Sequence, residues 1–111
     1  MFSAIYREAS EAGEAACNSA IPKPMIVNGD GTLYYVSEGL CGFAWIRFSG
    51  TTPFARWAKK MGYASKAYPK GMQVWVHSGG QSIARKEAYA HAFAAVLKKH
   101  GIECYADSRL D

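Results

Sequence analysis

Residues 72–107 read MQVWVHSGGQSIARKEAYAHAFAAVLKKHGIECYAD, and this stretch decides the fold. Residues 72–76 are rich in Val and Trp, a composition that favours a β-strand. Residues 82–100 are rich in alanine and long enough for a helix of several turns, and residues 102–106 alternate apolar and polar side chains as a strand does. The stretch therefore predicts a β-α-β crossover.

A glycine-rich turn joins the first of these strands to the helix. Ser82 is a good N-cap residue, and Gly101 is the stop signal at the far end. A glycine turn that opens a helix leaves backbone N–H groups free, and these attract anions. Arg85 and Lys86 lie in the first helical turn, where the helix dipole disfavours cations, and a bound anion would remove that conflict. The pattern therefore predicts an anion site, although it matches neither a P-loop nor a dinucleotide fingerprint.

The candidate ligand-binding residues at this turn are Gly79, Gly80, Gln81, Ser82, Arg85 and Lys86, together with Arg109. The alternative is an ordinary strand-to-helix turn, in which Arg85 and Lys86 pair with nearby acidic side chains.

The rest of the chain predicts two more helices and three more strands. Apolar residues recur every three or four positions near the N-terminus, and Thr-Pro starts a second helix. An Asn-Gly turn predicts a hairpin, and a strand with apolar side chains on both faces is expected to be central. These predicted elements are helices at residues 2–20 and 53–61, and strands at residues 25–27, 32–37 and 43–48.

The elements follow one another in the order α-β-β-β-α-β-α-β and predict a single α+β domain over residues 1–111. We expect a mixed sheet of about five strands, covered by three helices in a two-layer sandwich. Residues 63–71 are predicted to be an exposed basic loop. Trp45, Trp57 and Trp75 are expected to lie largely in the core.

Composition indicates a folded, intracellular protein. Half of the 111 residues are apolar, which is enough to build a core. The three cysteines are an odd number without regular spacing, which argues against a disulfide framework and for a reducing compartment. No apolar run is long enough to span a bilayer, and the N-terminal segment lacks the pattern of a secretory signal. We therefore expect a cytoplasmic protein with no membrane partner.

The net charge of +4 conceals an uneven distribution. No residue between Glu38 and Glu87 is acidic, and this interval holds eight basic and eight aromatic residues. A basic surface with nearby aromatic side chains favours binding to nucleic acid or to a phosphorylated small molecule. The alternative is an ordinary solvated face above a core of aromatic residues. The nucleic-acid-binding candidates, expected to contact phosphates and stack on bases, are Arg56, Lys60, Tyr63, Lys66, Tyr68 and Lys70.

Metal and nucleophilic chemistry have less support in the sequence. No cysteine or histidine pair shows the C-x-x-C or H-E-x-x-H spacing of common metal sites. A Cys41–His77 pair would suit nucleophilic catalysis, but a free cysteine more often packs in the core. We therefore expect a non-enzymatic protein with neither metal nor cofactor.

Three parts of the sequence carry a resemblance to a known family: residues 12–15 (AGEA) with residues 21–27 (IPKPMIV), residues 41–46 (CGFAWI), and residues 81–93 (QSIARKEAYAHAF) with residues 108–111 (SRLD). They resemble small α+β proteins of unknown function that are encoded by tailed bacteriophages and prophages. The resemblance covers most of the chain and implies a phage origin without a particular activity. It adds a second hypothesis, in which an accessory protein binds and inhibits a host protein or defence factor.

Overall fold

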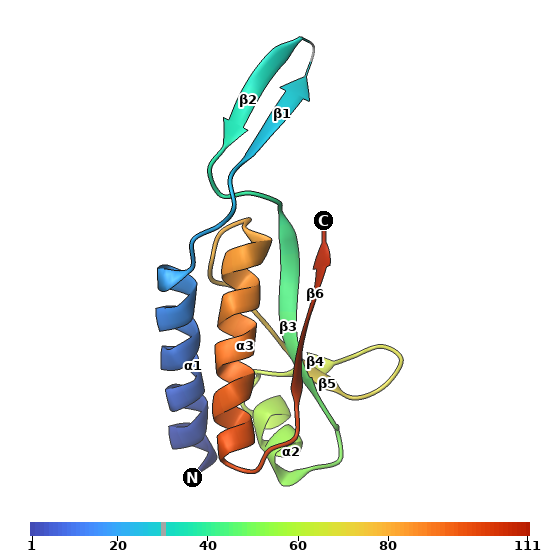
Figure 1. Ribbon diagram of the computed structural model, residues 1–111. Coiled ribbons are helices and arrows are strands. Elements are labelled where there is room, and N and C mark those ends of the chain that lie inside the picture. Colours follow the sequence, from blue (N-terminus) through green and yellow to red (C-terminus); the bar gives the residue numbers. More distant parts are fainter. Residues whose placement is uncertain (30) are drawn as a thin grey trace.

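The structure is a computed structural model that describes residues 1–29 and 31–111. Within these residues, three helices and six strands follow one another in the order α-β-β-β-α-β-β-α-β (Figure 1). The helices are α1 (Phe2–Ser19), α2 (Pro53–Lys60) and α3 (Ile83–Lys99). The strands are β1 (Met25–Gly29), β2 (Thr32–Val36), β3 (Gly42–Phe48), β4 (Ser65–Lys66), β5 (Met72–Trp75) and β6 (Tyr105–Leu110). The predicted α+β class is confirmed.

Four of the strands form an antiparallel sheet in the order β4-β5-β3-β6. β3 is central, as predicted, and Trp45 lies opposite Trp75 of β5 and Asp107 of β6. Since both neighbours run antiparallel to β3, β5 and β6 run in the same direction with β3 between them, and β5-α3-β6 is a split crossover. The prediction of a mixed sheet is therefore wrong, because every adjacent pair in the main sheet is antiparallel. The two crossover strands do not pair with each other, since β3, which is apolar on both faces, lies between them.

β1 and β2 form a separate two-stranded hairpin that projects from one end of the molecule (Figure 1). These two strands are therefore not part of the main sheet, which instead gains the short β4 from the segment predicted to be a loop. The predicted hairpin turn at residues 28–31 includes Asp30, which lies outside the described residues. The last strand begins three residues later than expected, at Tyr105, and continues to Leu110.

The helices begin and end close to the predicted residues because their caps are local signals. The Thr52 hydroxyl accepts a hydrogen bond from the Ala55 N–H at 3.1 Å, and the Ser82 hydroxyl accepts one from the Arg85 N–H at 3.3 Å. Gly101 follows α3 with a φ of +81°, which favours glycine. None of the described helices has the length and apolar composition needed to cross a bilayer.

The core lies between the helices and one face of the sheet. α3 packs on β3 and β6 with one side and on α1 with the other (Figure 1). The buried residues of α1 have small side chains, so α1 and α3 approach closely: a Cβ at Gly13 would lie 2.9 Å from the Tyr89 ring. The largest fully buried apolar side chains are Phe54, Phe93, Ile46 and Leu97.

The other face of the sheet is covered by no helix in the described residues, and we call it the open face. β3 alternates in burial along its length, so its odd-numbered residues point to this face. Trp45 and Trp75, expected in the core, lie here half-buried, with ring centroids 5.0 Å apart. The expectation that these two side chains lie in the core was wrong. Because both faces of β3 are apolar, the sequence does not show which of its side chains point to the core. The outward residues of the three main strands are Phe43, Trp45, Arg47, Gln73, Trp75, Tyr105, Asp107 and Arg109.

Candidate functional site

The start of α3, predicted to hold an anion, is closed by the protein's own backbone. The Ile83 N–H donates to the Leu40 carbonyl at 3.0 Å. The Arg85 and Lys86 N–H groups both donate to Ser82, one to its hydroxyl at 3.3 Å and one to its carbonyl at 3.1 Å. Because these donors are already bonded, the helix start offers little of the free amide surface that an anion needs.

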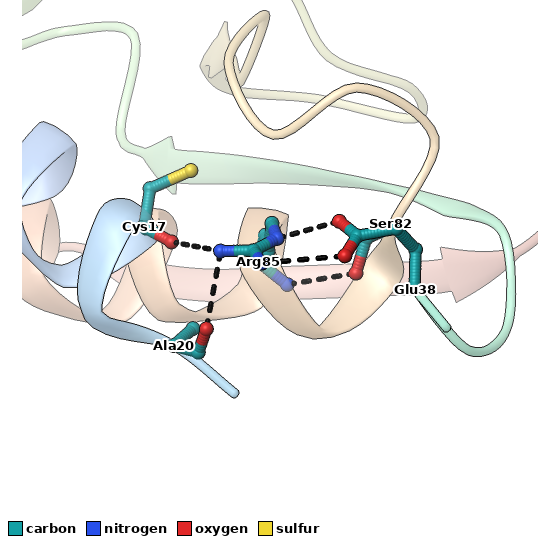
Figure 2. Close-up of polar contacts among 5 residues, drawn as sticks. All are labelled: Cys17, Ala20, Glu38, Ser82 and Arg85. Carbon is teal, nitrogen blue, oxygen red and sulfur yellow. Dashed lines mark hydrogen bonds and ion pairs between the residues drawn. The ribbon is translucent and has the colours of Figure 1, made fainter. Parts of the chain in front are cut away.

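Arg85 makes structural contacts in place of a ligand contact (Figure 2). Its Nε lies 2.6 Å from Oε1 of Glu38, and its Nη1 donates to the Cys17 and Ala20 carbonyls, each at 3.1 Å. The last turn of α1 has no basic residue of its own, so Arg85 caps the free carbonyls of that helix. The hydrogen bond from Arg85 lowers the pKa of Glu38. This arrangement is the alternative in which Arg85 pairs with a nearby acid.

The glycines of the turn also have structural reasons to be there. Gly79 and Gly80 have φ angles of +94° and +59°, which side-chain-bearing residues rarely adopt. A Cβ at Gly79 would lie 3.1 Å from the Cβ of Arg85 and 3.3 Å from Sγ of Cys17. The Gln81 carbonyl accepts a hydrogen bond from the Gly42 N–H at 3.1 Å, which holds the turn to β3.

A large basic cleft lies at the end of the sheet where β3 leads into α2. Its volume is about 1210 Å³. The walls come from the end of β3, the first turns of α2, the segment from β4 to β5, the end of α3 and the start of β6. Six basic residues line it, against the single acid Glu103, and they are Arg47, Arg56, Lys59, Lys66, Lys70 and Lys98.

These six cations are available to a ligand. None of them takes part in a salt bridge within the described residues. Arg47 supports the wall, because its Nη2 donates to the carbonyls of Tyr68 and Lys70 at 2.9 and 2.8 Å. Arg56 donates to the Thr51 carbonyl at 3.0 Å. Both guanidiniums keep their charge in these contacts, so the cleft has a positive field that carboxylates do not cancel.

No protein-family model, curated protein or solved structure matches this chain.

The cleft brings together three of the six residues predicted to bind nucleic acid, namely Arg56, Lys66 and Lys70. Tyr63 lies elsewhere, stacked on the Tyr6 ring at 4.4 Å. Tyr68 is 92% exposed, and neither it nor Lys60 lines the cleft.

Three further cations of the cleft were missed by the sequence analysis as site residues, and each for its own reason. Arg47 and Lys59 belong to the basic interval, but the sequence pattern places them in a central strand and near the end of a helix, and neither position predicts a ligand contact. Lys98 lies outside that interval, and only the packing of α3 on the sheet brings it to the cleft. Tyr105 is the missed aromatic: it lines the cleft, is 49% exposed and lies opposite Arg47 in the sheet.

The remaining predicted residues gather at a second place. Lys86 and Arg109 both approach the ring of Phe43, with Nζ and Cζ lying 5.4 and 5.5 Å from its centroid. They line a smaller cavity together with His77, whereas Cys41 is not among the lining residues. Within the described residues, no three His, Cys, Asp or Glu side chains are grouped as a metal site requires.

Proposed function

We propose that this protein binds single-stranded nucleic acid in the basic cleft, without catalysis. The observation that supports this most is the convergence of six unpaired cations on one cleft that has one acidic residue. The cations contact phosphate groups, and the affinity depends strongly on salt because each contact releases condensed counterions.

The size of the cleft favours an extended ligand over a compact one. Its volume of about 1210 Å³ exceeds the range of roughly 300–1,000 Å³ usual for small-molecule pockets. Cations on several walls of the cleft suit the repeated phosphates of a strand, whereas a single phosphorylated metabolite would engage only about two or three of them.

Aromatic side chains supply the second element of single-strand binding. Tyr105 is half-exposed in the cleft and also belongs to the open face. On that face, Trp45 lies two residues along β3 from Arg47, the residue opposite Tyr105, and Trp75 of β5 lies opposite Trp45. Four-stranded antiparallel sheets with exposed aromatic residues are a known platform for stacking unpaired bases. We expect bases to stack on Tyr105 first, since it adjoins the phosphate-binding cations.

The test is the salt dependence of binding to a fluorescent 20-nucleotide oligothymidylate, followed by anisotropy. Lys66 and Lys98 face the cleft from different segments and are exposed, so Lys66→Ala with Lys98→Ala keeps the fold. Each single-strand phosphate contact contributes about 0.7 to the slope of log K against log salt, so the double variant lowers the slope by about 1.4.

The matched control removes two exposed lysines outside the cleft, Lys23→Ala with Lys60→Ala, and retains the wild-type slope. The proposal is overturned if the wild-type protein does not bind the oligonucleotide at low salt. It is also overturned if the cleft and control variants have the same slope.

A second candidate function, binding to a host protein, is favoured by the projecting hairpin. Ile26, Leu33 and Tyr35 lie on one face of it and are 68%, 68% and 70% exposed. Ile26 lies directly opposite Tyr35, so the three side chains form one apolar surface. An exposed apolar surface of this kind is typical of contact with another protein.

Affinity capture from nuclease-treated host lysate separates the two functions. Under the second candidate, the wild-type protein and the cleft variant retain one defined partner, while Ile26→Ser with Tyr35→Ser loses it. Retention of nothing, or retention that the hairpin variant leaves unchanged, counts against the hairpin as the binding surface.

A further inference from the structure

A second cavity, separate from the basic cleft, lies at the opposite end of β3. Its volume is about 340 Å³. Phe43 and Trp75 belong to the open face, so the cavity opens on the same side of the sheet as Tyr105. Its lining residues are Phe43, Trp75, Val76, His77, Lys86 and Arg109.

Lys86 is the unusual residue of this cavity. It belongs to α3, on the covered side of the sheet, and is only 8% exposed. Yet its Nζ lies 5.4 Å from the centroid of Phe43, whose ring is on the open face. Within the described residues, Lys86 has neither an ion-pair partner nor a side-chain hydrogen bond. Its ammonium borders the cavity and has no acceptor among the described residues, so it is free to bind an anion there.

The adjacent acid does not fill this role. Glu87, the next residue of α3, accepts a hydrogen bond from the Ser108 hydroxyl at 2.5 Å. Arg109 adds a second cation, with its Cζ 5.5 Å from the centroid of the same Phe43 ring. Two cations that line one cavity make its potential positive, which favours a negative group inside it.

We propose that this cavity binds the phosphate of a nucleotide, with Lys86 and Arg109 donating to its oxygens and Trp75 stacking on the base. This inference rests on the proposed function for the class of ligand. A volume of about 340 Å³ is at the small end of ligand pockets and suits a single nucleotide unit. The partly buried Trp75 ring lines the cavity and offers a base an apolar surface, which inorganic phosphate has no group to contact.

The test compares adenosine 5′-monophosphate, adenosine and inorganic phosphate by calorimetric titration of the full chain. The monophosphate binds most tightly, because it alone engages both the cations and the ring. Lys86→Met, which keeps most of the side-chain volume, weakens its binding by about tenfold or more. Lys60→Met is the matched control and has wild-type affinity, since Lys60 lies outside both cavities.

A stability measurement guards against a variant that merely fails to fold. Lys86→Met keeps the buried aliphatic stem and breaks no ion pair of the described residues, so its melting temperature stays close to that of the wild type. The monophosphate raises the melting temperature of the wild type but not that of Lys86→Met. Arg109→Gln, at an exposed position, gives a second and independent loss of affinity.

The failure of this inference is distinguishable from failure of the proposed function. The cleft variant Lys66→Ala with Lys98→Ala weakens oligonucleotide binding and leaves monophosphate binding unchanged. If the oligonucleotide does not bind but the monophosphate binds through Lys86, the cavity stands as a free-nucleotide site and the proposed function falls. Equal affinity for adenosine and its monophosphate, or wild-type affinity in Lys86→Met, overturns the cavity inference.

Discussion

Arg85 and Glu38 are 47 positions apart in the sequence, and Nε of one lies 2.6 Å from Oε1 of the other. The same guanidinium caps the Cys17 and Ala20 carbonyls at the end of α1 (Figure 2). One side chain therefore joins three parts of the chain: the end of α1, the segment that leaves the hairpin, and the first turn of α3. This contact gives Arg85 a structural role.

We expect Arg85→Met to lower the melting temperature by several degrees, because it leaves two helix-end carbonyls and a carboxylate without their donor. Thermal unfolding followed by circular dichroism measures the change. Arg7→Met is the control, since Arg7 makes only an exposed pair with Glu11 within α1. Equal melting temperatures for the two variants would show that the Arg85 contacts contribute no more than an ordinary surface pair.

Acid pH should weaken the same contact. Arg85 lowers the pKa of Glu38 below its ordinary value of 4.5 in the folded protein, so the unfolded chain takes up the proton first as the pH falls. The stabilisation from this pair is complete above that value and is lost as the pH falls through the folded-state pKa. In Glu38→Gln, the deficit in melting temperature relative to wild type is constant near neutral pH and shrinks below about pH 4.5. A deficit that does not change with pH would contradict this assignment.

Tyr105 offers a test of stacking that is independent of charge. Tyr105→Leu should weaken binding to the 20-nucleotide oligothymidylate by about 5- to 150-fold, since stacking contributes roughly 1–3 kcal/mol per base. The slope of log K against log salt stays at the wild-type value, because no cation is removed. Tyr68→Leu is the control, at a 92% exposed tyrosine outside the cleft lining. A loss of equal size in both variants would contradict specific stacking on Tyr105. It would indicate that the ligand lies over the loop that joins β4 to β5, residues 67–71, which contains Tyr68.

The close packing of α1 on α3 requires glycine at position 13. Alanine has the better helix propensity by about 1 kcal/mol, but its Cβ would lie 2.9 Å from the Tyr89 ring, which stacks on Phe93 at 6.0 Å. Overpacking costs about 1–3 kcal/mol, so Gly13→Ala should destabilise the protein by about 1 kcal/mol in urea unfolding. In a Tyr89→Leu background the same change becomes neutral or stabilising. Destabilisation of equal size in both backgrounds would point away from the ring contact.

The sequence predicts the features that depend on neighbouring residues and misses those that depend on distant ones. Helix limits follow from local caps such as Thr52 and Ser82, and the structure confirms them. The sheet order does not follow, because pairing of β3 with both β5 and β6 is a property of the folded chain. The role of Arg85 depends on Glu38, which no helix-based pattern connects to it.

The candidate site shows the same division. The excess of positive charge between Glu38 and Glu87 is visible in the sequence, and most of the basic cleft comes from it. The sequence does not show that Lys98 joins this charge, while Lys99, one residue later, turns to an ion pair with Glu8 on α1. The different roles of Lys98 and Lys99 become visible only when the packing of α3 against the sheet and α1 is known.

The central place of β3 has a consequence for how the chain acquires its structure during synthesis. β3 leaves the ribosome before both of its pairing partners, and the second of them, β6, follows more than fifty residues later. Until β6 arrives, the backbone N–H and C=O groups of Gly42 to Arg47 that later bond to it have no partner strand. An unpaired strand edge of this kind can pair with strands of other chains. Because this pairing spans so much of the chain, we expect slow folding and sensitivity of nascent protein to aggregation.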